Sequence, residues 1–150
     1  MIRLSDPPID PGALLTGFLE GRRETGAVVS FTGLVRGDGG VEALELEAYP
    51  GFTEPAIEQI IRDAVERFGL DDCLAVHRVG RIAPGEPVVF VAAAARHRRA
   101  AFEGADYLMD YLKSRAPFWK KSHEAAGARW VEPTPGDQAD LARWETMETR

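Results

Sequence analysis

The sequence predicts an α+β fold, a single domain over residues 1–150 with strand hairpins and two long helices. Three observations favour this class. The chain has 150 residues and 45% hydrophobic content, which suits one soluble domain with one core. Several short segments alternate apolar and polar residues, as strands do, and two longer ones carry apolar residues three and four apart, as helices do. Strand-like and helical segments are interspersed along the chain, which favours mixed layers.

The N-terminal segments predict a short helix and then a hairpin. Asp10–Gly21 begins with a residue that caps helices well, followed at once by proline, and its leucines fall on one side. Gly26–Arg36 is rich in β-branched residues, and Val41–Tyr49 alternates. The sequence GDGG between them is typical of a tight turn. We therefore expect these two strands to pair with each other.

The middle of the chain predicts one long helix and two strands. Thr53–Phe68 carries a continuous apolar stripe, with Thr53 as the candidate cap and Gly69 as the stop. Cys73–Val79 is expected to form a strand. Val88–Ala95 is apolar without interruption, which indicates a strand buried on both faces.

The C-terminal third predicts the second long helix and a less regular end. His97–Ala116 has helical spacing, and Pro117 stops it. Its expected core residues are Phe102, Ala105, Met109 and Leu112. The segment RWVEP is expected to be a short strand, and the polar tail after about residue 135 is expected to be partly loose, with one helical turn near Ala139.

Charge is unevenly distributed. The net charge is −6, which argues against general nucleic-acid binding. Between Arg96 and Lys121, however, seven Arg or Lys residues face three acidic ones, so this segment carries +4 and the remainder −10. A local basic region on an acidic protein favours a confined anion site.

Other classes of site are disfavoured. A single cysteine, Cys73, excludes an internal disulfide and a cysteine-based metal cluster, and the three histidines have no metal-ligand spacing. We therefore expect no metal and no cofactor, a buried unreactive Cys73 and a structural His77. No segment has the length of a membrane span, and the N-terminus lacks the apolar stretch of a signal peptide. These features predict a cytoplasmic protein without membrane contact.

The basic segment offers two candidate groups. RHRR (96–99) falls where a buried strand leads into a helix, whose free N–H groups suit an anion. A solvated helix start explains the same residues equally well. Lys113 lies more than ~20 Å from His97 along that helix, so one small pocket holds both only if it is elongated or completed by another chain.

Lys113 and Lys120 form the second group. If the chain folds back after Pro117, the two amines approach each other, and repulsion together with nearby aromatic rings lowers the pKa of one of them. Surface lysines flanking an aromatic anchor are the alternative explanation.

Several blocks resemble a known family. They are FTGLVR (31–36), YPGFTE (49–54), HRVG (77–80), the region around His97, MDYLKSRAPFWKK (109–121) and RWVE (129–132). The match runs from about residue 26 to residue 132, which is most of the chain, and these blocks are similar to the large, catalytic (MoaE) subunit of molybdopterin synthase. The long MDYLKxRAPFWK block is highly specific.

The resemblance implies an α/β-hammerhead fold and a sulfurtransferase. Such enzymes convert cyclic pyranopterin monophosphate (precursor Z) into molybdopterin by installing two sulfurs as a dithiolene. Sulfur arrives as a thiocarboxylate on the C-terminal glycine of a small ubiquitin-like subunit. The large subunit forms a homodimer within a heterotetramer, and the small subunit's C-terminal segment enters its pocket.

The resemblance also implies site residues. The two catalytic lysines fall on Lys113 and Lys120. Residues implied to bind substrate are Leu34, Val35, Arg36, His97, Arg98, Lys113, Lys120, Lys121 and Ser122. Some members of the family carry an acid where this chain has Ser122.

Two other interpretations stay open. The chain could be a non-catalytic module that binds the ubiquitin-like partner or a phosphorylated pterin, or the basic segment could serve only homodimer packing. Turnover distinguishes the first from the enzyme, and charge reversal at Arg98 distinguishes the second.

Overall fold

The computed structural model describes residues 1–148 and contains two sheets and four α-helices. The strands are β1 (Ile2–Ser5), β2 (Ala27–Leu34), β3 (Val41–Ala48), β4 (Asp72–Arg78), β5 (Gly80–Ile82), β6 (Pro87–Ala95), β7 (Phe118–Glu124) and β8 (Gly127–Trp130). The helices are α1 (Pro11–Leu19), α2 (Thr53–Phe68), α3 (Arg98–Arg115) and α4 (Pro135–Glu148), with a 3₁₀ turn at Asp38–Gly40. The mixed elements confirm the α+β class.

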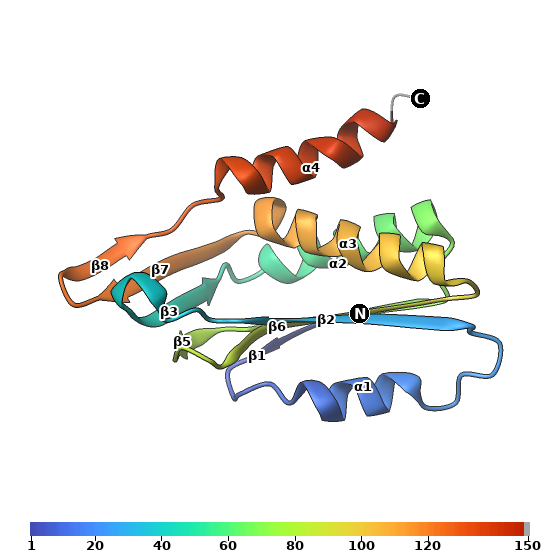
Figure 1. The fold of residues 1–150 in the computed structure, drawn as a ribbon, viewed down its shortest axis with the longest axis horizontal. Coiled ribbons are helices and arrows are strands. Elements are labelled where there is room, and N and C mark those ends of the chain that lie inside the picture. The colour runs from blue at the N-terminus through green and yellow to red at the C-terminus, as the bar shows by residue number, and fades with distance from the viewer. Residues whose placement is uncertain (149–150) are drawn as a thin grey trace.

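Both sheets have four strands, and the one with the longer strands, called the larger sheet, is the centre of a layered body. Its strand order is β1-β4-β6-β2, with β1 parallel to β4 and the other pairs antiparallel. Helix α1 lies on one face, α2 and α3 cover the other, and α4 lies on the outer side of α3 (Figure 1). Strand β6 is buried from Val89 to Ala95, so its continuous apolar sequence does reflect burial on both faces.

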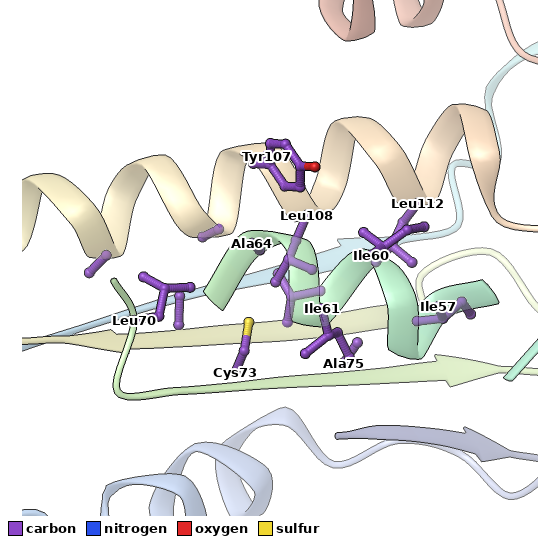
Figure 2. Close-up of a cluster of buried hydrophobic side chains, with 14 of the residues drawn as sticks. Ile57, Ile60, Ile61, Ala64, Leu70, Cys73, Ala75, Tyr107, Leu108 and Leu112 are labelled. Carbon is purple, nitrogen blue, oxygen red and sulfur yellow. The ribbon is translucent and has the colours of Figure 1, made fainter. Parts of the chain in front are cut away.

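The main core fills the space between that sheet and helices α2 and α3 (Figure 2). The stripe of α2 contributes Ile57, Ile60, Ile61 and Ala64, and Leu108 of α3 is fully buried against them. Helix α2 ends as predicted at Gly69, which adopts a left-handed conformation (φ 63°) that favours glycine. Cys73 points into this core (Figure 2), and burial raises the pKa of its thiol to about 12, which keeps it unreactive.

The predicted hairpin is wrong. Strand β2 pairs with β6 in the larger sheet, whereas β3 belongs to a second sheet of order β5-β3-β7-β8. Just beyond β2, Val35 N–H donates to the Glu86 carbonyl at 3.0 Å, and the Val35 carbonyl accepts from Gly85 N–H at 2.8 Å. The turn before β6 thus occupies the backbone groups of Val35, and the 3₁₀ turn then directs the chain into the other sheet.

Two details of the helices also differ from expectation. Phe52, not Thr53, occupies the cap position of α2, and Thr53 is the first helical residue. Phe102 is 61% exposed, so its predicted core position is wrong. The buried face of α3 contains small residues instead, among them Gly104, where a Cβ would lie 2.8 Å from Leu70 Cδ1. Gly104 faces the core, and Phe102, two positions earlier, therefore lies on the opposite, exposed side of the helix.

The tail forms a longer helix than the single turn indicated by its sequence. Helix α4 packs on α3 through buried Leu141 and Trp144. The indole Nε1–H of Trp144 donates to Asp110 at 2.6 Å, and Arg143 bonds the same carboxylate at 2.8 Å. Within residues 1–148, no helix is long and apolar enough to cross a bilayer.

Candidate active site

A cavity of about 840 Å³ lies where the second sheet meets the C-terminal end of α3. Its walls come from the end of β2, strands β3 and β7, the last turn of α3 and the segment before α4. Six residues predicted from the sequence line it: Leu34, Val35, Arg36, Lys113, Lys120 and Ser122. The fold therefore brings together segments that are up to 88 positions apart, from 34 to 122.

The alternation of β7 decides which of its residues face the cavity. Phe118, Lys120 and Ser122 line it, as expected for positions two apart on one side of a strand. The residues between them turn to the other side, where Lys121 Nζ lies 4.8 Å from the ring centroid of Trp130. Trp119 packs there against the same ring at 5.2 Å. Lys121, which the resemblance grouped with the substrate-binding residues, does not line this cavity.

The two lysines predicted as catalytic meet across the cavity from different elements. Lys113 lies in the last turn of α3 and is exposed, whereas Lys120 lies in β7 and is partly buried. Burial lowers the pKa of the Lys120 amine, the positive charge of Lys113 lowers it further, and Asp137 acts in the opposite direction. A larger fraction of Lys120 is therefore neutral near pH 7 than for an ordinary lysine.

A buried hydroxyl joins the segment before α2 to the segment between α3 and β7, both of which border the cavity. Thr53 is fully buried, donates from Oγ1 to the Pro117 carbonyl at 2.5 Å and accepts from Tyr49 N–H at 2.8 Å. Pro117 separates α3 from β7, so this bond fixes the segment that joins Lys113 to Lys120.

Replacing Thr53 with valine should destabilise the protein by about 1–3 kcal/mol. Valine has the same shape but leaves the Pro117 carbonyl and the Tyr49 N–H without their partner in a buried place. Urea unfolding would measure the loss, and Thr53→Ser, which keeps the hydroxyl, is the matched control. Equal midpoints for the valine variant and the wild type would show that Thr53 is not a clamp.

His77 is a cavity residue to which the sequence assigned only a structural role. It is 9% exposed and lines the cavity from β4. Its Nδ1 lies 3.0 Å from the Arg78 carbonyl, and its ring stacks on Phe118 with centroids 4.3 Å apart. Burial lowers the pKa of His77 to about 4, and Lys120 and Lys113 contribute in the same direction. The signal in the sequence was one imidazole after the apolar run CLAV in the stretch CLAVHRV, which did not reveal the cavity.

His97 and Arg98 lie at the opposite end of α3. His97 is the cap residue of that helix and Arg98 its first residue, and both are exposed. The helical rise separates them from Lys113 by roughly 20 Å. Within one chain they do not meet the lysines. Among residues 1–148, no group of three His, Cys, Asp or Glu side chains could hold a metal ion.

Known proteins resemble this chain in sequence and in fold. A family model described as "MoaE protein" matches residues 4–115. The molybdopterin synthase catalytic subunit of Caulobacter vibrioides is 60% identical over 146 residues, 97% of either chain.

Two solved structures extend the comparison. The molybdopterin biosynthesis MoaE protein from Burkholderia ambifaria has a TM-score of 0.84 and 43% identity, with 97% of each chain covered. Molybdopterin synthase from Staphylococcus aureus has a TM-score of 0.77 and 31% identity, with 86% of this chain and 95% of that chain covered. The chain therefore belongs to the MoaE family, the catalytic subunits of molybdopterin synthase.

Proposed function

We propose that this subunit converts cyclic pyranopterin monophosphate into molybdopterin in the cytoplasm, with sulfur from the thiocarboxylated C-terminus of a small ubiquitin-like carrier. The observation that carries the proposal is the pair of amines in one cavity, with the pKa of Lys120 lowered by burial and by Lys113. Membership in a family of catalytic subunits supports a catalytic role for this pair.

The two amines have different tasks. The positive charge of Lys113 binds the thiocarboxylate and the negative charge that develops as sulfur adds to the pterin side chain. Lys120, whose pKa lies closer to neutrality, transfers protons as sulfur adds and the phosphate ring opens. Each of the two sulfur atoms comes from one thiocarboxylate, which adds to the pterin side chain through sulfur. Water then cleaves the acyl C–S bond, so the sulfur stays on the pterin and the carrier leaves as a carboxylate.

Anion binding uses one residue at the edge of the cavity and two residues supplied by a second copy of the chain. Arg36 lines the cavity with an exposed side chain, whose Nε forms an exposed ion pair with Asp38 Oδ1 at 3.7 Å. Exposed ion pairs contribute little stability, so Arg36 can exchange Asp38 for a phosphate. His97 and Arg98 reach a phosphate in this cavity only if a second copy of the chain supplies them. Phe102, exposed one helical turn after Arg98 on the same side of α3, supports a covered surface there. We infer a homodimer that binds one carrier at each end, a heterotetramer.

Reconstitution tests the proposal. Purified protein, precursor Z and thiocarboxylated carrier should yield dithiolene product, and a carrier ending in an ordinary carboxylate should yield none. Arg98→Glu should lower turnover while the dimer persists. Product formation that does not depend on the thiocarboxylate would contradict the proposed sulfur source. Carrier binding without any product would favour a non-catalytic binding module.

A further inference from the structure

The imidazole of His77 has one ring nitrogen without a function in the fold. A carbonyl oxygen only accepts hydrogen bonds, so the 3.0 Å contact with the Arg78 carbonyl places the proton of the neutral ring on Nδ1. Nε2 is then unprotonated and has no hydrogen-bond partner among residues 1–148. Every fully buried side-chain nitrogen or oxygen in this part of the chain has a hydrogen-bond partner. Because Nε2 has none, it is not fully buried, and it opens to the cavity that His77 lines.

The surroundings of His77 keep that nitrogen an acceptor. Phe118 covers the ring, and Val88, Val89 and Leu112 form nearby apolar walls of the cavity. Lys113 and Lys120 face it from α3 and β7, so protonation would add a third cation in a place with little water. A fixed acceptor beside two cations suits a guest that carries an N–H donor next to a negative charge.

We infer that Nε2 of His77 accepts a hydrogen bond from the peptide N–H of the carrier's terminal glycine and so orients the thiocarboxylate between the lysines. The inference rests on the proposed function. In a terminal glycine, the N–Cα and Cα–C bonds place the peptide nitrogen only about 2.5 Å from the thiocarboxylate carbon. A guest whose negative end is held by Lys113 and Lys120 therefore carries its N–H into the neighbourhood of His77.

The chemistry of this wall favours a peptide over the pterin ring. His77 offers a single acceptor among apolar side chains, which matches the single donor of an extended glycine. A pterin edge carries several donors and acceptors side by side, and most of them would stay unpaired against Val88, Val89 and Phe118. His77 is thus a positioning residue for the sulfur donor.

Two substitutions separate the ring nitrogens. His77→Asn keeps a donor near the position of Nδ1, which can still bond the Arg78 carbonyl, but removes the atom at Nε2. His77→Gln places an amide near Nε2 and restores an acceptor there. Calorimetry should show that His77→Asn weakens binding of intact carrier about 10-fold, that His77→Gln recovers most of the loss, and that a carrier without its last two glycines binds all three proteins alike.

A chemically modified carrier tests the named atom. Replacing the terminal glycine with N-methylglycine removes the peptide N–H, which should weaken binding to the wild type about 10-fold and to His77→Asn not at all. Equal losses in both proteins would overturn the inference, as would a His77→Asn defect that persists with the shortened carrier or appears only in precursor Z binding. If the wild type itself binds intact and shortened carrier equally, segment insertion fails, and with it the proposed function. In every other outcome, the result for His77 leaves the proposed function unchanged.

Discussion

Replacing Lys120 with methionine is expected to lower dithiolene formation by about 10²–10⁴-fold, the range that a positioned proton-transfer group contributes, while the protein becomes no less stable. The folded protein disfavours the charged amine of Lys120 through burial and the charge of Lys113. A methionine side chain of similar length removes that cost and keeps the packing. The single-turnover rate of product formation should therefore fall, while the midpoint of thermal unfolding should stay the same or rise.

The matched control removes a cation elsewhere. Arg62→Met changes an exposed residue of α2 that bonds Gln59 on the helix surface, and it should leave turnover and unfolding close to wild type. Turnover of Lys120→Met within a few-fold of wild type would contradict the assigned role. A marked loss of stability would show that the Lys120 amine contributes favourable contacts, contrary to its lowered pKa.

Acid should unfold the protein more readily through His77. The pKa is about 4 in the folded chain and 6.5 as the ordinary value, so between these limits the unfolded state binds a proton that the folded state does not. The free energy of unfolding therefore falls as the pH falls from about 6.5 to 4, by about 3 kcal/mol in total, and above that window His77 has no effect. The charges that face it from other elements, Lys120 and Lys113, strengthen the effect.

The contribution is measured as a difference between two proteins. His77→Gln does not titrate, so urea unfolding at pH 7 and at pH 4.5 should show a smaller loss of stability for the variant than for the wild type. Carboxylates such as Glu86, whose pKa is lowered by Arg78, weaken both proteins alike in acid and cancel in the comparison. Parallel curves for the two proteins across this range would show that His77 titrates normally in the folded state.

Local sequence patterns predicted the helices and strands far better than they predicted which strands pair and which residues pack together. The Asp10 cap of α1, the apolar stripe of α2 and its end at Gly69, and the apolar run of β6 are properties of adjacent residues, and they were confirmed. The pairing of β2 with β6 joins residues 53 to 68 positions apart, from Leu34 with Pro87 to Ala27 with Ala95. The burial of Gly104 in place of Phe102 likewise depends on Leu70, and neither contact is visible in local spacing.

The site was predicted in part for the same reason. The specific motif pointed to Lys113 and Lys120, and both line the cavity. The expected lowering of one pKa agrees with the direction found for Lys120. The alternation that takes Lys121 out of the cavity requires knowing that residues 118–124 form a strand, which the sequence did not indicate. His77 enters the site only because β4 and β7 belong to different sheets whose ends meet.

The packing of helix α4 is coupled to the protonation of Lys120. Asp137, in its first turn, favours the ammonium form of Lys120, and the helix is held in place by Trp144 and Arg143 on Asp110. Because linkage is reciprocal, we expect protonation of Lys120 to favour the packing of α4 and its deprotonation to weaken that packing. Amide exchange along 135–145 is therefore expected to follow the charge state of the Lys120 amine as pH is varied.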